Sequence, residues 1–382
     1  MARRLSDSGT RGRVFLYSIE MKMVILSTLL VMGLSASTVS AQCMYEYIPL
    51  PRVPDGPLTR TLTNQGIGED DTIIGYLNFP LQVPGQWTLE DESLTILTLP
   101  DGFAQGQALG IYNSGASVGH VSFPNNGMRH PVFWRDGVPE LLPRAHPDDF
   151  AFPLAINRHL HLVGWANGPG LKGEQGFIRP AIWIDGEYSE ILNFPVGPNA
   201  GAEDINDRGE IVGWMGIGLS NNRSAFHWVD GVATDLGLFP NGASTKAVAI
   251  NNLGLIVGSG FDTVLQDSRP LYWHRGVARL LPVPNDVRSG TAQDVNDGGQ
   301  IVGMIQLINW EAQSCLWQQG QRYDLNKLLI NDPGSFIGSA RAINNRGVIS
   351  VGVAVLVPID SPREDVDHNC RVDVEDLLLM LG

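Results

Sequence analysis

The sequence predicts an all-β fold built from one repeated unit of about four strands, and three observations lead to this prediction. A short motif, the Asn phrase, recurs seven times along the 382 residues. It reads Ile-Asn, two variable residues and Gly, followed by a β-branched pair and a second Gly. A second phrase, in which a tryptophan strand precedes a tight turn, recurs with the same period. No helix-like segment of useful length lies between Tyr45 and Pro358. A fixed period of this size is typical of an array of similar supersecondary units.

The first half of each unit is a strand that runs into the Asn phrase. The clean copies begin at Ile205, Ile250 and Val295, and each leads into an Ile-Val-Gly segment. An Asn can bond its own backbone and a Gly can take the left-handed conformation, so the phrase predicts a turn between two strands. Looser copies are centred on Asn64, Asn113, Asn157 and Asn344. The successive spacings of the seven asparagines are 49, 44, 49, 45, 45 and 48 residues.

The second half of each unit is a tryptophan strand, a tight turn and a strand that ends in Leu. Six of the nine tryptophans occupy the same slot, 44 to 49 residues apart: Trp87, Trp134, Trp183, Trp228, Trp273 and Trp317. The turn that follows is an Asp-Gly pair at Asp136, Asp185 and Asp230. Such pairs accept positive φ at both positions, as a two-residue hairpin turn requires. The runs of Ile, Val, Leu, Phe and Trp between the turns suit half-buried strands.

Four strands in about 45 residues is the size of one blade of a β-propeller. A parallel β-helix has shorter coils, and helical or leucine-rich repeats have fewer turns. Stacked β-sandwiches are the rival all-β architecture, but the contiguous repeats favour a radial array. The sequence therefore predicts a β-propeller of four-stranded blades.

The number of blades depends on the two ends of the repeat region. Six units carry both phrases, whereas the seventh Asn phrase, at Asn344, has no tryptophan strand after it. The segment Tyr45–Leu50, ahead of the first Asn phrase, looks like a fourth strand without its blade. Joining the two partial units would close a ring of seven blades and leave no free sheet edge. We therefore favour seven blades, with six as the alternative.

The ends of the chain differ from the repeats. Residues 1–41 hold a basic extension, an apolar stretch and small residues, which predicts a cleaved signal peptide and hence secretion or display on the cell surface. A start at Met21 or Met23 would be more usual for such a signal. The apolar stretch is too short for a membrane-spanning helix. The repeats occupy residues 42–358, and residues 359–382 form a linker and a tail.

The net charge excludes some classes of binding partner, and the cysteines allow one disulfide. The chain has 40 acidic and 26 basic residues; residues 1–41 hold two and five of these, so the rest has 38 and 21 and a net charge near −17. Such a surface repels nucleic acid and anionic membranes. A closed ring would bring Cys43 and Cys370 together, so they could form a disulfide in an oxidising compartment. Cys315 precedes a repeat tryptophan and is expected to be buried.

The tail carries the ligand spacing of an EF-hand type calcium loop. A hard cation takes six to eight oxygen ligands, and here they would fall at loop positions 1, 3, 5, 7, 9 and 12. The predicted ligands are Asp365, Asp367, Asn369, Arg371 (through its backbone carbonyl), Asp373 and Asp376. Cys370 stands where glycine is usual, and Asp376 stands where glutamate is usual. The alternative interpretation is an acidic, solvated tail.

Two segments resemble known families. The copy Ala225–Gly231, with Ser224 before it in place of His, is similar to the HAF repeat of bacterial proteins expected to be extracellular, and this resemblance covers about residues 60–353. The Val-Asp-x-x-Asp-Leu-Leu wording at Val372 resembles a dockerin module, although dockerins carry two such loops and only one is present. The resemblances imply a modular secreted protein that docks to a partner through its tail. They bring no catalytic residues.

Few residues point to chemistry. The sequence contains no Gly-x-Ser-x-Gly elbow, phosphate-binding loop or zinc-protease helix. His159 and His161 alternate on what would be one strand face and could bind a metal, but no third ligand is visible nearby. Four acidic residues could gather at a propeller mouth: Asp148, Asp149, Glu203 and Asp294.

Three functions remain open. We favour a binding or interaction scaffold for a protein or a glycan, with calcium bound in the tail. The alternatives are a propeller-type polysaccharide hydrolase or lyase and a purely structural surface protein. Function in a propeller lies in the loops around its mouth rather than in the fold. An enzyme requires several titratable side chains that converge at that mouth, whereas a binding protein requires an aromatic or polar groove without them.

Overall fold

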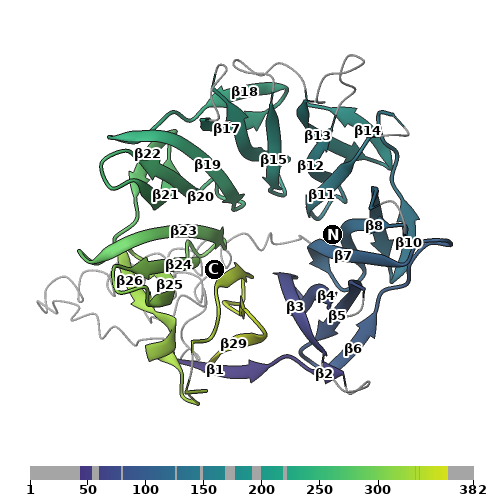
Figure 1. The fold of residues 1–382 in the computed structure, drawn as a ribbon, viewed down its shortest axis with the longest axis horizontal. Helices are drawn as coiled ribbons and strands as arrows, with labels where there is room; N and C mark the ends of the chain where they lie inside the picture. Colours follow the sequence, from purple (N-terminus) through teal and green to yellow (C-terminus); the bar gives the residue numbers. More distant parts are fainter. Residues whose placement is uncertain are drawn as a thin grey trace, which may run out of the picture.

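The computed structural model describes residues 44–359, apart from 54–59, 79–80, 125–126, 147–148, 168–176, 192–198, 218–221, 332 and 335. These residues form seven antiparallel sheets around a central axis, so the predicted seven-bladed propeller is confirmed and six blades is wrong (Figure 1). Helix is confined, in this part of the chain, to one short 3-10 turn, η1 (Leu325–Leu328).

Each blade has four strands that follow one another from the axis to the rim. The innermost strands are β3 (Arg60–Ile67), β7 (Gln105–Asn113), β11 (Ala151–Ile156), β15 (Ala200–Ile205), β19 (Gly242–Ile250), β23 (Val287–Val295) and β27 (Ala340–Ile343). The second strands are β4 (Thr72–Leu77), β8 (Ala116–Ser122), β12 (Leu162–Asn167), β16 (Ile211–Gly216), β20 (Ile256–Asp262), β24 (Ile301–Leu307) and β28 (Ile349–Val351).

The outer half of each blade completes the sheet. The third strands are β5 (Val83–Thr88), β9 (Arg129–Arg135), β13 (Ile178–Ile184), β17 (Arg223–Val229), β21 (Asp267–His274), β25 (Ala312–Gln318) and β29 (Ala354–Ile359). The outermost strands are β6 (Ser93–Ile96), β10 (Val138–Leu141), β14 (Glu187–Glu190), β18 (Val232–Asp235), β22 (Val277–Leu280), β26 (Gln321–Asp324) and β1 (Met44–Pro49). A two-residue strand, β2 (Arg52–Val53), also pairs with the start of β3.

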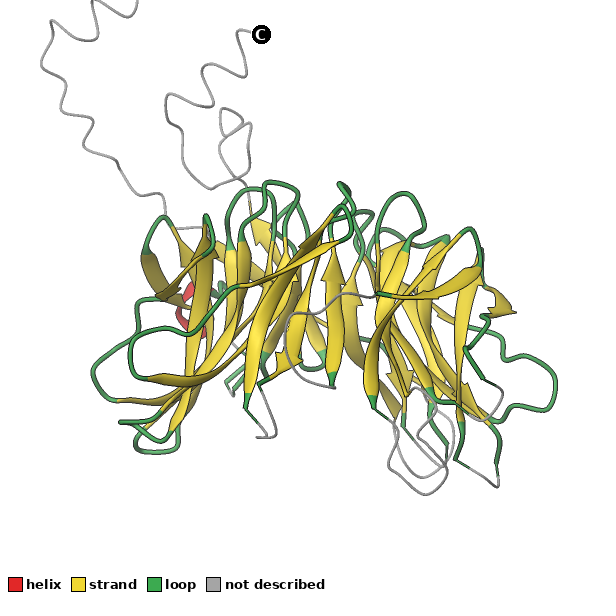
Figure 2. Cartoon of the chain, turned by 90° about the horizontal axis from the view of Figure 1, so that it is seen from above, coloured by secondary structure: helices red, strands yellow, loops and turns green. Residues whose placement is uncertain are grey.

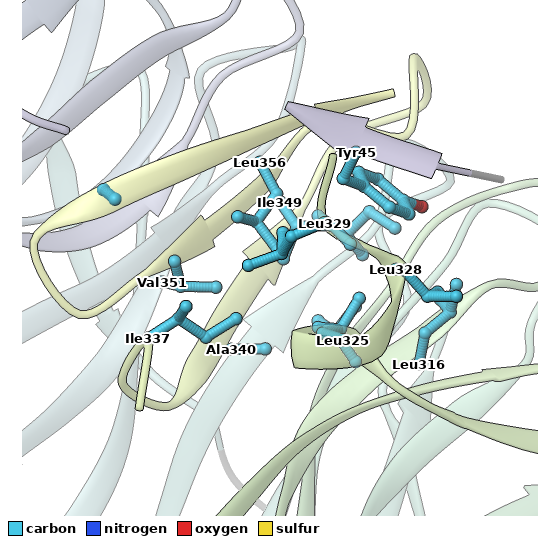
Figure 3. Close-up of a cluster of buried hydrophobic side chains, with 13 residues drawn as sticks. Tyr45, Leu316, Leu325, Leu328, Leu329, Ile337, Ala340, Ile349, Val351 and Leu356 are labelled. Atoms are coloured by element: carbon cyan, nitrogen blue, oxygen red, sulfur yellow. The ribbon is translucent and has the colours of Figure 1, made fainter. Parts of the chain in front are cut away.

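The last blade combines the two ends of the described chain. Strand β1 pairs antiparallel with β29, and Tyr45 lies opposite Pro358. Tyr45 is fully buried in a cluster that includes Leu316, Leu325 and Leu356 (Figure 3). The predicted closure by the strand at Tyr45 is therefore confirmed, and this blade has no free outer edge at β29.

The hydrophobic core is divided among the interfaces between blades. Five tryptophans of the repeated slot are at most 2% exposed: Trp87, Trp134, Trp183, Trp273 and Trp317. The indole N–H of Trp134 donates to the carbonyl oxygen of Thr98, and that of Trp183 donates to Pro143, at 2.8 and 2.9 Å. Both acceptors lie in the loop that follows the preceding blade. The repeated tryptophan therefore joins each of these blades to its neighbour by packing and by a hydrogen bond.

The propeller has two unlike faces, which are seen edge-on in Figure 2. The Asn phrases connect first to second strands, and the Asp-Gly pairs connect third to fourth strands, so both lie on one face, the turn face. Asp136 and Gly137 have φ of 49° and 77°, as predicted for the hairpin turn. The opposite face, the loop face, carries the connections from second to third strands and from one blade to the next.

Candidate functional site

The seven innermost strands share a β-bulge three residues ahead of the turn. In β15 the register shifts between Ala202 and Asp204, which makes Glu203 the extra residue. The equivalent residues are Gln65, Leu109, Leu154, Val248, Gln293 and Arg341. The strands approach closely here, because a Cβ atom on Gly213 would overlap the carbonyl oxygen of Gly201. The Gly of Ile-Val-Gly is therefore required by this close approach.

In five of the seven phrases, the asparagine stabilises its own turn and also joins two blades. The Oδ1 atom of Asn251 accepts the backbone N–H groups of Leu253 and Leu255, at 3.0 and 2.8 Å. Its Nδ2 atom donates to the carbonyl oxygen of Asn296 in the next blade, at 2.8 Å. Four more asparagines repeat this blade-to-blade bond: Asn157, Asn206, Asn296 and Asn344. We call these five residues the asparagine belt.

The first two blades depart from the predicted phrase. Strand register places Gly68 and Tyr112 at the positions that correspond to the belt asparagines. Asn64 instead lies within β3, and Asn113 lies one residue too late, so both sequence assignments were wrong. Asn344 still donates to the carbonyl oxygen of Gly68, at 3.0 Å. The belt needs only a backbone acceptor there, which any residue supplies.

The residues after four of the belt asparagines, together with Glu69 after Gly68, form a second ring, the mouth belt: Glu69, Asp207, Asn252, Asp297 and Asn345. Each backbone N–H from Asp207 onward donates to the side chain in the next blade, at 2.7 to 3.2 Å. The amide of Asn252 also donates to the carboxylates on both sides, Asp207 and Asp297. This ring lines a cavity of about 350 Å³ at the channel mouth.

Two further carboxyl groups line the same cavity. The Oδ2 atom of Asp204 accepts the backbone N–H of Ile250, and that of Asp294 accepts the N–H of Ile343, each in the following blade and each at 2.8 Å. Part of Asp204 stays open to the channel, yet desolvation by the surrounding blades raises the pKa of Asp204 to about 7. Desolvation likewise raises the pKa of Asp294 to about 6.

Titratable side chains thus converge at the mouth, as an enzyme would require, but each of their carboxyl oxygens already accepts a hydrogen bond from the protein. Both oxygens of each of five carboxyl groups accept hydrogen bonds from the protein: Glu69, Asp204, Asp207, Asp294 and Asp297. A general base must direct a lone pair at its substrate. These groups direct theirs at amides, and most of the bonds cross from one blade to the next. The arrangement therefore joins neighbouring blades through hydrogen bonds.

Of the four acidic residues named from the sequence, two line the channel: Glu203 and Asp294. Asp149 is buried in the loop before β11, on the loop face, and Asp148 lies outside the described residues. Glu203 is paired, since its Oε1 atom lies 2.9 Å from Nζ of Lys246. The gathering of all four at one mouth was therefore wrong.

The histidine pair lies in a turn. His159 and His161 donate their backbone N–H groups to Oδ1 of Asn157, so they belong to the turn and not to a strand face. Their rings are 5.9 Å apart, and no group of three His, Cys, Asp or Glu suited to a metal occurs among the described residues. Cys315 is buried, as expected. The predicted signal peptide, Cys43, Cys370 and the six predicted calcium ligands, Asp365 to Asp376, lie outside the described part of the chain.

A pocket lined by aromatic side chains opens on the loop face between the second and third blades. Its volume is about 590 Å³, and its walls are mainly Arg129, Phe150, Phe152, Trp165, Asn167 and Ile178. Phe152 and Trp165 lie opposite each other on β11 and β12 and stack with ring centroids 4.1 Å apart. The Arg129 guanidinium lies 5.2 Å from the centre of the Phe152 ring. No described carboxylate lines this pocket.

Sequence reasoning missed this pocket, although a signal was present. Three of the nine tryptophans fall outside the repeated slot: Trp165, Trp214 and Trp310. Trp214 is buried under Arg223, whose guanidinium is 3.8 Å from the ring centre. Trp310 is 63% exposed in a loop-face turn. Tryptophans that break the repeat therefore mark places where single blades differ.

Comparison with known proteins identifies the fold. No family model matches the chain, and no curated protein matches it. The chain is similar to an oligogalacturonate lyase from Vibrio parahaemolyticus, with a TM-score of 0.53 and 9% identity over 84% of this chain and 92% of that one. It is also similar to the β-propeller domain of the Trilobed protease from Pyrococcus furiosus, with a TM-score of 0.50 and 13% identity over 72% and 83% of the two chains.

A prolyl endopeptidase matches with a TM-score of 0.52 and 10% identity over 69% of this chain and 42% of that one. The Trilobed protease propeller has an open velcro topology, whereas here β1 completes the last blade. No helix among the described residues is long and apolar enough to cross a membrane. At these identities the likeness concerns architecture alone, and the chain is a seven-bladed β-propeller repeat protein.

Proposed function

We propose that this chain is a secreted or surface-displayed binding protein that holds a glycan on the loop face of its propeller. The pocket around Phe152 and Trp165 carries this proposal. The faces of a sugar ring expose C–H groups, which pack favourably on aromatic rings, while its hydroxyl groups need a few polar partners at the edge. A pocket with three aromatic side chains, an arginine and an asparagine supplies both.

The channel mouth supports binding over catalysis. Its carboxyl groups accept hydrogen bonds that join neighbouring blades. Groups with this structural role are less suited to act as general acids or bases on a substrate. The loop-face pocket has aromatic walls and no described carboxylate, which is the groove that a binding protein requires.

The test is direct titration of the purified protein with a panel of oligosaccharides, followed by calorimetry. Trp165→Ala should reduce affinity at least tenfold, whereas Trp165→Phe, which keeps a ring, should retain most of it. Trp310→Ala is the matched control, because it removes an exposed tryptophan outside the pocket. Binding that survives Trp165→Ala in a folded protein would contradict the proposed site.

One observation favours a polysaccharide hydrolase or lyase as the second candidate. The pKa values of Asp204 and Asp294, about 7 and about 6, suit proton transfer near neutral pH. Incubation with polysaccharides, with reducing ends and new double bonds as the readout, distinguishes the two functions. Turnover that is lost in Asp204→Ala and Asp294→Ala would replace the binding proposal.

We also propose that the tail binds calcium and docks a partner protein. The support is the ligand spacing from Asp365 to Asp376, together with the resemblance to a dockerin loop. Calcium titration of the full chain should show one site that Asp365→Ala removes, while Asp360→Ala, outside the loop, should leave it intact. Identical titrations for the wild-type protein and Asp365→Ala would remove this assignment.

A further inference from the structure

We infer that the loop-face pocket selects a carboxylated saccharide, such as a uronic acid, and that Arg129 is the residue that selects it. This inference rests on the proposed glycan binding and names the class of glycan.

Arg129 is a cation without a partner in an acidic protein. The chain carries a formal net charge of −14, yet Arg129 forms no ion pair among the described residues. Some other exposed arginines are paired, for example Arg135 with Glu140 at 3.2 Å and Arg208 with Glu210 at 2.9 Å. The guanidinium is instead held over the face of Phe152. It therefore presents its donors to whatever enters the pocket.

No other charged side chain among the described residues lines the pocket beside Arg129. His120 packs edge-on against Phe152, with ring centroids 5.3 Å apart, and is 5% exposed. Burial, with a smaller contribution from Arg129, lowers the pKa of His120 to about 4, so this ring is neutral at physiological pH. Asp149 precedes Phe150 in the chain but does not line the pocket. Among the described residues that line the pocket, Arg129 is the one charged side chain, and it lies beside an apolar platform.

This combination matches the two chemical features of a uronic acid. The half-buried Trp165 ring, stacked on the buried Phe152, offers an aromatic surface to the apolar face of a pyranose. A guanidinium presents a planar fork that fits both oxygens of a carboxylate. The backbone N–H of Asn167 donates to the carbonyl oxygen of Phe150 at 2.9 Å, which ties two walls of the pocket together. A neutral sugar would stack on the aromatic surface but would offer no carboxylate to the Arg129 guanidinium.

The experiment compares oligosaccharides that differ only at the acidic group. A galacturonate oligomer, its methyl ester and a sulfated galactose oligomer are titrated into wild-type protein, Arg129→Gln and Arg129→Lys. Hydrogen bonds to a charged group contribute roughly 10- to 100-fold in affinity. We expect the galacturonate oligomer to bind wild-type protein at least tenfold more tightly than its ester. Arg129→Gln should remove that preference while changing the affinity for the ester less than threefold, and Arg129→Lys should retain part of it.

The outcomes separate this inference from the proposed function. Equal affinity for acid and ester, or a preference that survives Arg129→Gln, would overturn the role of Arg129 while leaving glycan binding intact. Tighter binding of the sulfated oligomer would overturn the assignment to a carboxylate. Flat titrations for all three saccharides would overturn both proposals. Arg129 is exposed, so thermal melting should show that its variants fold normally.

Discussion

The asparagine belt predicts a specific cost for removing one of its members, and Asn251 offers the clearest case. Its side chain is 5% exposed and makes three hydrogen bonds, two within its turn and one to the next blade. At about 1 kcal/mol net for each bond, Asn251→Ala would cost about 3 kcal/mol. Two features lower this figure. The carbonyl oxygen of Asn296 keeps a second bond from Gly299, and Leu253 lies exposed, so its N–H can reach water. We therefore expect a loss of about 2 kcal/mol.

Urea unfolding, followed by tryptophan fluorescence and far-UV circular dichroism together, measures this loss. Leu253→Ala is the matched control, because the side chain is 73% exposed in the same turn and its removal should change stability by less than about 0.5 kcal/mol. Hydrogen exchange should accelerate at Leu255 in Asn251→Ala, since that N–H loses its acceptor. A loss below about 0.5 kcal/mol for Asn251→Ala would refute the view that the belt joins blades energetically.

Three further predictions concern packing, closure and pH. Gly213→Ala should reduce the free energy of unfolding by more than about 3 kcal/mol in thermal unfolding, because the added Cβ would meet backbone atoms. Gly231→Ala has open space around its Cβ but a φ of 87°, so it should cost only about 1 kcal/mol. Equal losses for the two variants would contradict the bulge argument. Tyr45→Ala should lose about 3 to 5 kcal/mol of stability, because it weakens the packing that closes the ring. Tyr45→Phe should be nearly neutral, because the buried hydroxyl has no hydrogen-bond partner. A large loss of stability for Tyr45→Phe would refute this reasoning. Burial raises the pKa of Asp204 to about 7 and that of Asp294 to about 6, so the folded state holds protons that the unfolded chain releases. Stability should therefore fall as pH rises from about 4 to about 7, and the double alanine variant should lose that slope.

The parts of the fold that sequence predicted depend on local backbone chemistry. An Asp-Gly pair accepts positive φ wherever it stands, so Asp136 and Gly137 announce a hairpin turn without any knowledge of their neighbours. The segment at Tyr45 was recognisable as a strand without a blade, and the incomplete seventh unit needed an outermost strand. Period and turn chemistry together therefore predicted blade number and closure.

The parts that sequence missed depend on contacts between one unit and the next. The asparagine belt ends on backbone carbonyl oxygens, and these carry no side-chain signature. This is why Gly68 can receive the bond from Asn344 although it bears no resemblance to asparagine. The bulges were hidden for a related reason. Their extra residue varies from Glu203 to Leu154 to Arg341, because a bulge constrains the backbone and leaves the side chain free to face the channel.

What repeats in this chain holds it together, so a ligand site should be sought where a blade departs from the repeat. One register position makes the point. Phe152 lies opposite Trp165, and in the next blade the same two positions hold Gly201 and Trp214. A Cβ on Gly201 would strike the Trp214 ring, so that indole fills the space beside the glycine and is buried. In the third blade the phenylalanine holds Trp165 outward as a stacked, half-buried platform. A single exchange at one slot of a regular blade therefore accompanies the change from a buried tryptophan to a partly exposed one.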